Sequence, residues 1–339
     1  MRKFDYIIVG QGIAGTTLSY ELLRRGHTVC VVDKGIEGSS SYIAGGVINP
    51  ITGRNYVKSW RIDDFLPEAM TFYTDVGKLL KSEVPYYRPM DIWWFLKDVQ
   101  KENNWLTKAC SPAHEQYMLA RPFEEDVSYI QEGHTYGIYK VQGGGRVDSV
   151  RLLSDYRHYL SENGSLLEAD FQIDKATISD TIQFQDIHAE HIIFCDGYRS
   201  YQNPYFENLP FRITQGEFFI LHIPDLEVDA MIKLKQTLIP LGNSNYWYGA
   251  TYDWDADPSK PLVKVEKDFL LKGLNQVLSV PYEIVHHKVG LRPTTVDRRP
   301  LLKQSQTQSN VYLFNGMGSK GFSQAPLLAK EFVDAFFTS

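Results

Sequence analysis

The sequence predicts an α/β protein that contains a dinucleotide-binding βαβ unit and an inserted, mostly β region. Three observations predict this fold. A glycine-rich turn follows the first expected strand, a second glycine-rich turn lies near the C-terminus, and residues 211–290 show mainly short strand patterns. The chain has 339 residues, of which 43% are hydrophobic and 22% charged, a composition typical of a globular protein with about two domains.

The first glycine turn lies within a complete βαβ pattern. Residues 5–9 (DYIIV) predict a strand, residues 16–25 a helix, and residues 28–32 a second strand that ends at Asp33. The glycines of the GxGxxG motif are Gly10, Gly12 and Gly15. They permit the tight turn, the approach of the backbone to a pyrophosphate, and close packing of helix on strand. Asp33 can accept a hydrogen bond from a ribose hydroxyl, and its charge disfavours the 2′-phosphate of NADP.

The second glycine turn repeats the GxGxxG spacing at Gly316, Gly318 and Gly321. It lies between an expected strand, residues 311–314, and an expected helix, residues 325–337. Too few residues follow this helix to form another strand with a terminal acid, so a second dinucleotide unit is not expected. We interpret the turn as a helix N-terminus directed at an electron-rich group, beside Lys320. Such a site suits a flavin, whose reduced ring carries negative charge; the alternative is that these glycines serve packing alone.

Charge and side-chain spacing argue against several other classes of protein. The net charge is −6 and there is no long basic run, so the sequence gives no support for nucleic-acid binding. The three cysteines and nine histidines show no ligand spacing, and neither a metal site nor a disulfide framework is expected. No apolar run has the length of a membrane span or of a signal peptide's apolar segment, so we expect a cytoplasmic protein.

Blocks along nearly the whole chain resemble the FAD-dependent D-amino-acid-oxidase-like (DAO) superfamily, which includes glycine oxidase and sarcosine oxidase. The blocks are YIIVGQGIAG, VVDKG, SSSYIAGGVINP, GGGRVDSVRL, HIIFCDGYRS, QGEFFIL, YWYGATYD, VGLRPTTVDRRPLL and GMGSKGFSQAPLLAKE. Among them, GATYD and GMGSKGFSQAPLLA are most similar to the oxidase domain of the bifunctional tRNA 5-methylaminomethyl-uridine biosynthesis protein. The resemblance implies an FAD-binding Rossmann-like domain with an inserted antiparallel β-rich substrate domain, as in the glutathione-reductase-like flavin fold.

The resemblance also implies how the chain is divided. The FAD-binding domain is expected to be discontinuous, from residues 1–75, 142–205 and 290–339. The substrate-binding domain is expected from residues 76–141 and 206–289.

The resemblance further implies which residues contact FAD. Those expected near the pyrophosphate and ribose are Gly10, Gly12, Ile13, Ala14, Gly15, Asp33, Lys34, Ser40 and Ser41. Those expected along the isoalloxazine ring are Gly45, Gly46 and Val47, and those expected near the adenine and ADP are Phe171 and Gly197. Those expected at the pyrimidine edge of the flavin are Gly316, Met317, Gly318, Ser319, Lys320 and Gly321. No cysteine lies near the last block, so FAD is expected to bind without a covalent link.

Three residues are expected to act in catalysis. Arg292 lies where the amino-acid oxidases hold a substrate carboxylate, although an ion pair with Asp297 is an alternative role for it. Lys320 would stabilise the reduced, anionic flavin. Tyr248 belongs to an alternating aromatic strand that could form a wall over the ring, although core packing is the better interpretation for at least one of its tyrosines.

The expected function is FAD-dependent oxidation of the C–N bond of an amine or amino acid. Hydride passes to flavin N5, and the imine is then hydrolysed. The electron acceptor stays open between oxygen, quinone and another protein. One alternative is a stand-alone oxidoreductase for the wobble uridine of tRNA, which the net charge and the missing methyltransferase domain disfavour. A second is a flavin hydroxylase, suggested by DGYRS at residues 196–200, and a third is a non-enzymatic flavin-binding protein.

Overall fold

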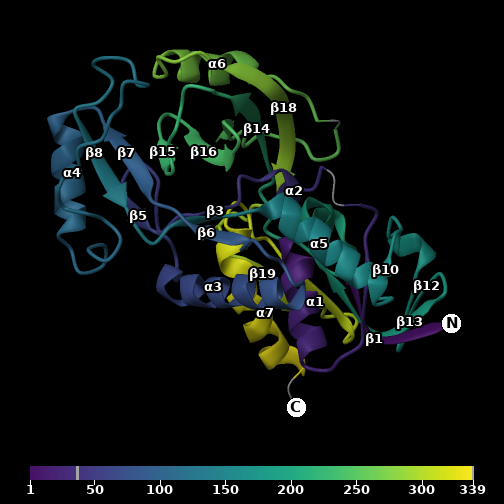
Figure 1. Cartoon of the computed structure of the whole chain (residues 1–339). Coiled ribbons are helices and arrows are strands. Elements are labelled where there is room, and N and C mark those ends of the chain that lie inside the picture. Colours follow the sequence, from purple (N-terminus) through teal and green to yellow (C-terminus); the bar gives the residue numbers. More distant parts are fainter. Residues whose placement is uncertain (36–37, 261, 338–339) are drawn as a thin grey trace.

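The computed structural model describes residues 1–35, 38–260 and 262–337, and it is organised around two large sheets (Figure 1). The first sheet has eight strands in the order β10-β2-β1-β13-β12-β11, with β20 also paired to β13 and β19 paired to β20. Its strands are β1 (Arg2–Val9), β2 (Val29–Val32), β10 (Leu166–Leu167), β11 (Thr177–Ile178), β12 (Ile182–Phe184), β13 (Ile187–Phe194), β19 (Leu301–Gln304) and β20 (Val311–Asn315). The run from β10 through β2, β1 and β13 to β20 is parallel.

Both faces of the parallel strands are buried, which explains their nearly continuous apolar sequences. One face, with Ile8 and Val31, belongs to a core shared with the helices. The opposite face, with Ile7 and Cys30, packs against a separate apolar cluster. The longer helices are α1 (Ile13–Arg24), α3 (Ile62–Leu79), α4 (Val99–Ala109), α5 (Ser149–Glu162), α6 (Lys267–Asn275) and α7 (Gly321–Phe337). Short helical segments are α2 (Ser40–Ile43), η1 (Ile173–Lys175) and η2 (Gly197–Gln202).

The second sheet is mostly antiparallel and has seven strands in the order β18-β14-β17-β16-β15-β7-β8. Its strands are β7 (Ile92–Leu96), β8 (Gly137–Val141), β14 (Thr214–His222), β15 (Met231–Lys233), β16 (Thr237–Gly242), β17 (Asn245–Gly249) and β18 (Glu283–Arg292). Within it, β15 pairs with β7 in parallel. In Figure 1 this sheet, with α4 and α6, forms the upper lobe above the helices of the first sheet.

Two small sheets lie between the large ones. One joins β3 (Val47–Ile48), β9 (Gly145–Val147) and β6 (Tyr87–Pro89), and the other is the hairpin of β4 (Ile51–Thr52) and β5 (Val57–Lys58). All strands of the first large sheet fall within the segments expected to form the FAD-binding domain. The second sheet is built from the other two segments, apart from the last three residues of β18. The division into two domains remains a proposal. α3 continues past the boundary expected at residue 75, and β6, from the expected substrate-binding segment, pairs with β9 of the expected FAD-binding segment.

The expected βαβ unit is present as β1, α1 and β2. The Asp148 carboxylate caps α5 by accepting from the Arg151 N–H. The helix expected at residues 325–337 begins four residues earlier, at Gly321. Glycine's low helix propensity hides this start in the sequence.

Close packing explains the glycine at the third position of the first motif. A Cβ added at Gly15 would lie 1.9 Å from the carbonyl oxygen of Gly10, so α1 could not pack this closely with any larger residue. Gly10 itself has a φ of 97°, which L-residues rarely adopt. The first turn of α1 is therefore fixed directly against the end of β1.

A buried polar network joins the ends of β13 and β20. The Ser200 hydroxyl donates to the Asp196 carboxylate, and the Asn315 side-chain amide donates to Ser200 Oγ at 2.9 Å and to the Gly197 carbonyl at 2.8 Å. Burial raises the pKa of Asp196 to about 6, although its hydrogen bond with Ser200 acts in the opposite direction. This carboxyl therefore changes its charge near neutral pH.

Two glycines within helices should respond oppositely to alanine. Gly77, within α3, has open space where a Cβ would lie, so Gly77→Ala should raise the free energy of unfolding by up to about 1 kcal/mol through helix propensity. Gly15→Ala should lower it by about 2 kcal/mol or more, because the added methyl group meets backbone. Urea unfolding of both variants measures the difference, and equal effects would contradict the packing role of Gly15.

The Asp196 carboxyl should make stability depend on pH. Because its pKa is higher in the native state than in the unfolded chain, the native state binds more protons between about pH 4 and pH 6 and loses stability as the pH rises. A native pKa of about 6 predicts a loss of about 1.4 kcal/mol between about pH 5 and pH 8. Asp196→Asn keeps an oxygen that can accept from Ser200 and should remove this loss. Urea unfolding at both pH values, at equal cofactor content, tests it; the same pH dependence in variant and wild type would refute it.

Candidate active site

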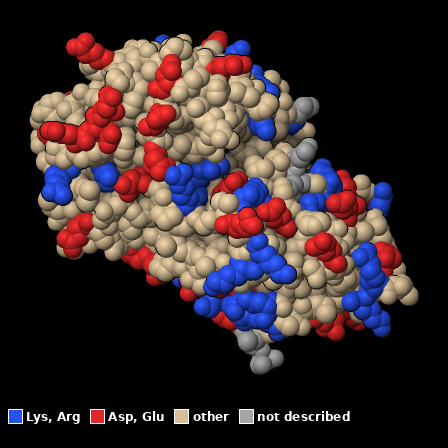
Figure 2. All heavy atoms as spheres, in the orientation of Figure 1, with Lys and Arg blue, Asp and Glu red and all other residues tan. Residues whose placement is uncertain are grey.

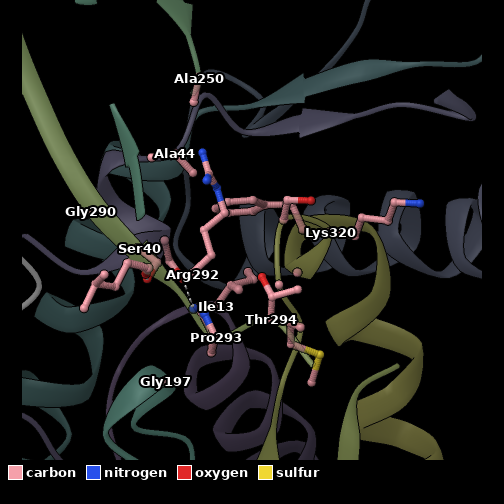
Figure 3. Close-up of a pocket in the computed structure, with 18 of the residues that line it drawn as sticks. Ile13, Ser40, Ala44, Gly197, Ala250, Gly290, Arg292, Pro293, Thr294 and Lys320 are labelled. Carbon is pink, nitrogen blue, oxygen red and sulfur yellow. Dashed lines mark hydrogen bonds between the residues drawn. The ribbon is translucent and has the colours of Figure 1, made fainter. Parts of the chain in front are cut away.

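A large cavity lies between the two sheets and is lined by residues from both. Its volume is about 2080 Å³, about twice the upper end of the range for small-molecule sites, so it has room for a dinucleotide and a substrate together. Figure 3 shows part of its wall, where Arg292 and Lys320 lie above the segments that carry Ile13 and Thr294.

The two glycine turns meet in this cavity. A Cβ added at Gly321 would lie 2.8 Å from Ile13 Cγ2, so the first turn of α7 packs directly on the first turn of α1. Gly12 and Gly318 both line the cavity. Residues from the two ends of the chain therefore form one site, and both helices begin at it.

At the start of α1 the cavity wall has the features of a phosphate cradle. The residue before the helix, Gly12, has no side chain that could cap it, and the Ile13 N–H donates to Ser41 Oγ from a distant segment at 3.0 Å. A Cβ added at Gly12 would lie 3.1 Å from the same oxygen, so a larger residue would fill the space beside the helix. Helix N-terminal N–H groups with room for a ligand suit an anion such as pyrophosphate. Ser40 lies nearby, but its hydroxyl donates to the Leu291 carbonyl.

Asp33 lies where an acid for the ribose is expected, at the end of β2. Its carboxylate accepts from the Gln11 N–H and the Gly35 N–H, both at 2.8 Å, and from Arg157 Nη1 at 3.0 Å. A carboxylate has about four acceptor positions, so one is left for a ligand. Arg157 lies on α5, far from Asp33 in the chain, so no local sequence pattern indicates this contact. Lys34 Nζ lies 4.0 Å from the Asp170 carboxylate, on the cavity wall.

The segment expected along the flavin ring is packed too tightly for side chains. A Cβ added at Gly46 would lie 1.9 Å from the Val147 carbonyl oxygen, and one added at Gly45 would lie 2.7 Å from Ile239 Cδ1. Backbone therefore forms this part of the wall, between β9 and the second sheet. These contacts, with the Gly12 cradle, fit a large planar cofactor whose phosphates lie at α1.

Most of the expected cofactor residues line the cavity. They are Gly10, Gly12, Ile13, Ala14, Asp33, Lys34, Ser40, Ser41, Gly45, Gly46, Val47, Phe171, Gly197, Gly316, Met317, Gly318, Ser319, Lys320 and Gly321. Gly15 does not line it and serves the contact between α1 and Gly10 described above.

The placement expected for Tyr248 needs correction. Tyr248 is fully buried in the core of the second sheet, outside the cavity wall, and its hydroxyl faces Gln236 Oε1 at 3.4 Å. The neighbouring residue, Trp247, lines the cavity instead, stacks on Phe218 with ring centroids 5.0 Å apart, and donates from its indole to the Ile43 carbonyl. Alternation along the strand predicted two faces but could not decide which one faces the site.

Arg292 has no carboxylate partner among the residues that the structure describes. Its Nη1 donates to the Thr251 carbonyl at 3.2 Å, and its guanidinium lies 4.3 Å from the centre of the Tyr252 ring. The expected alternative partner, Asp297, instead accepts from the Arg299 N–H. Burial lowers the pKa of Arg292. A guanidinium held in the wall of a cavity without a counter-charge is suited to an anionic ligand.

Lys320 belongs to a second group of cations. Its Nζ donates to Ser59 Oγ at 3.2 Å, and in Figure 3 its side chain extends away from Arg292. Burial, with the neighbouring charges of Arg298 and Arg299, lowers the pKa of Lys320. The Arg299 guanidinium lies 4.0 Å from the centre of the Trp60 ring. Arg298 and Arg299 are adjacent basic residues in a turn, a pattern that usually indicates only contact with solvent, so the sequence does not predict their place in the cavity wall.

The residues that the structure describes contain no group of three or more potential metal ligands, and all three cysteines are free. None of the described helices combines the length and apolar composition that a membrane crossing requires. On the face shown in Figure 2, acidic and basic side chains are interspersed.

Curated proteins with similar sequences include the following two. "Uncharacterized oxidoreductase YurR" of Bacillus subtilis (strain 168) is 23% identical over 364 residues, which cover 96% of this chain and 93% of the relative. The bifunctional protein MnmC of Idiomarina loihiensis, named for tRNA 5-methylaminomethyl-2-thiouridine biosynthesis, is 23% identical over 128 residues, or 36% of this chain and 21% of MnmC.

Solved structures share the fold over nearly the whole chain. Glycine oxidase from Geobacillus kaustophilus has a TM-score of 0.77 at 16% identity and covers 100% of this chain and 96% of its own. Iminodiacetate oxidase (IdaA) from Chelativorans sp. BNC1 has a TM-score of 0.75 at 18% identity and covers 96% and 93%. The sequence model of the DAO family, described as FAD dependent oxidoreductase, matches residues 5–335. The chain therefore belongs to the DAO family of FAD-dependent oxidoreductases.

Proposed function

We propose that this protein oxidises the C–N bond of a small amine or amino acid that carries a carboxylate. The observation that carries the proposal is Arg292, a guanidinium without an ionic partner in the described chain, in the wall of a cavity that also contains both glycine turns. Neighbours in fold are named glycine oxidase and iminodiacetate oxidase, both of which act on amines that carry carboxylates. At this level of identity the likeness concerns the fold, so the substrate class rests on Arg292.

The cofactor is held by residues from both ends of the chain. The N–H groups at the start of α1 bind the pyrophosphate, with Ser41 beside them, and Asp33 binds the adenosine ribose. Gly45 and Gly46 provide the flat backbone against which the ring lies. Bound FAD supplies the two-electron acceptor that takes hydride from the carbon next to the amine. No cysteine lies in the Met317–Gly321 segment, so the attachment is non-covalent.

Arg292 positions the substrate. Two charge-assisted hydrogen bonds from one guanidinium to a carboxylate fix both its location and its orientation, with each bond worth about 1.5–3 kcal/mol. Thr251 and Tyr252 hold the guanidinium from the other side, so it keeps a single geometry. A carboxylate held in this way directs the neighbouring C–H at the acceptor, which converts binding energy into orientation.

The walls exclude water and favour developing negative charge. Trp247 and Phe218 form an apolar surface beside Gly249, and Lys320 adds positive charge at the N-terminus of α7. Among the described residues, no histidine or glutamate lines the cavity. In the proposed reaction the amine reacts in its neutral form, and its own lone pair assists loss of hydride.

The two alternative reactions have weaker support. The match to MnmC covers about a third of this chain, and charges of both signs are mixed on the face in Figure 2. In the DGYRS segment that suggested a flavin hydroxylase, the residues Asp196 and Ser200 bond to each other and to Asn315. We therefore propose neither reaction; steeply salt-dependent tRNA binding would favour the first, and substrate-stimulated NAD(P)H consumption the second.

The purified protein should be yellow and should bleach with an amine in the absence of oxygen. The expected result is a flavin absorbance spectrum that is lost on anaerobic addition of glycine, sarcosine, a D-amino acid or L-proline, because hydride transfer reduces the ring. Parallel additions of the corresponding amines without a carboxylate should bleach far more slowly. A colourless protein that cannot be reconstituted with FAD would contradict the assignment, as would bleaching by modified uridine alone.

Replacing Arg292 with leucine should separate substrate binding from cofactor binding. Arg292→Leu should raise the KM for the carboxylate-bearing amine about a hundredfold, since two charge-assisted hydrogen bonds are lost, while bound FAD per protein stays unchanged. Arg212 provides a matched control, because it is exposed, stacks on Trp254 and lies outside the cavity wall. Steady-state kinetics and flavin absorbance measure both effects. An unchanged KM would remove Arg292 from the substrate site.

A further inference from the structure

A row of residues crosses the second sheet and faces the cavity. In register from β14 to β7, the row runs through neighbouring strands in the order Phe218, Gly249, Thr237, Lys233 and Trp94. All five residues line the cavity. This row is therefore uncharged at Phe218, Gly249 and Thr237, and it carries the ammonium group of Lys233 next to β7.

Lys233 has no ionic partner among the residues that the structure describes. Its Nζ donates to Thr237 Oγ1 at 3.1 Å and forms no ion pair, although the side chain is partly buried. Burial lowers the pKa of Lys233, as expected for an ammonium that lacks a counter-charge. By contrast, Lys140, on β8 two strands away in the same sheet, pairs with Asp91 at 2.9 Å. A partly buried ammonium without a counter-charge lowers the stability of the protein unless an anionic ligand pairs with it.

Trp94 provides a second, independent observation at the same place. It is the register partner of Lys233, is 8% exposed, and its buried indole N–H has no acceptor. Buried donors without partners are rare in native proteins and call for an explanation. Lys233 and Trp94, neighbours in one cavity wall, therefore each carry a hydrogen-bond donor, and neither donor has a negatively charged acceptor among the described residues.

The separation between Lys233 and Arg292 sets the length of a ligand that contacts both. The Arg292 guanidinium covers Gly216, where an added Cβ would lie 2.2 Å from Nη2. Gly216 and Thr237 lie two strands apart and two residues out of register, which corresponds to about 12 Å. A contact of about 3 Å at each end leaves about 6 Å between two anionic groups. An amine with one carbon between its nitrogen and each of two acid groups spans about 5 Å between those groups.

We propose that the substrate carries a second anionic group, a carboxylate or a phosphate or phosphonate, and that Lys233 binds this group while Arg292 binds the first carboxylate. The inference rests on the proposed function and narrows its substrate class to amines with two anionic groups. The amine lies between them, over the apolar row of Phe218 and Gly249. Lys233 is then the residue that selects such amines over those with one carboxylate.

The test compares three ligands that differ only in the second group. Sarcosine has a methyl group on the nitrogen of glycine, iminodiacetate adds a carboxylate to that methyl group, and N-phosphonomethylglycine adds a phosphonate. Their dissociation constants are measured by calorimetry on the dithionite-reduced FAD protein, which cannot turn the ligands over. Wild type should bind the better dianionic ligand at least about tenfold more tightly than sarcosine, and the tighter of the two identifies the second group.

Four variants assign the preference to Lys233. Lys233→Met should abolish the preference for dianionic ligands and leave the dissociation constant of sarcosine within about twofold of the wild-type value. Lys233→Arg should retain the preference. Trp94→Phe keeps an aromatic ring and removes the N–H. It should weaken binding of the dianionic ligands and leave binding of sarcosine unchanged. Lys272→Met is the matched charge control, because Lys272 is an exposed lysine of the same lobe, on α6 and outside the cavity wall.

Several results would overturn the inference. They are a wild type without preference for dianionic ligands, a Lys233→Met variant that loses affinity for all three ligands equally, and a Lys272→Met variant with the same effect as Lys233→Met. The proposed function fails separately. If sarcosine bleaches the flavin and no dianionic preference exists, the function stands and this inference is wrong. If the preference depends on Lys233 and no amine bleaches the flavin, the second anion site stands and the function is wrong.

Discussion

Contact between two helix N-termini at one edge of the parallel sheet is the constraint on which the site depends. α1 reaches this edge because Gly15 allows its backbone to touch Gly10, and α7 reaches it because Gly321 allows contact with Ile13. Any side chain at either glycine would separate the helices and move their N–H groups away from the same cavity. Packing and electrostatics are therefore not independent here, since close approach is what places two positive helix ends beside one ligand.

The second sheet closes the site, and glycines again allow the close contacts that this requires. Gly45 and Gly46 let the chain lie between β9 and the second sheet, and Gly216 lets the Arg292 guanidinium lie flat on β14. Because these positions are glycines, larger side chains such as Trp247 have room in the cavity wall. The second sheet does more than close the cavity, because it supplies Arg292, which orients the substrate in the proposed function, and the apolar surface beside it.

The local parts of this structure could be predicted from the sequence and the non-local parts could not. The βαβ unit depends on residues close together in the chain, and its prediction is confirmed. The partnership of Asp33 with Arg157 joins two distant elements and leaves no local pattern. Tyr248 and Trp247 illustrate a different limit. Period-two alternation separates them onto two faces, but the fold of the whole sheet decides which face is buried.

The charges in the cavity argue for the nature of its ligand more strongly than the net charge of the chain does. The protein carries a net charge of −6, yet lysine and arginine outnumber aspartate among the described residues of the cavity wall. Arg292 and Lys233 lack carboxylate partners in the described chain, and burial lowers the pKa of both. A buried cation without a counter-charge lowers the stability of the ligand-free protein. A bound anion supplies that counter-charge, so part of the binding free energy comes from removing this destabilisation. A neutral amine gains nothing from this arrangement, whereas an amine with acid groups at both ends satisfies both cations at once.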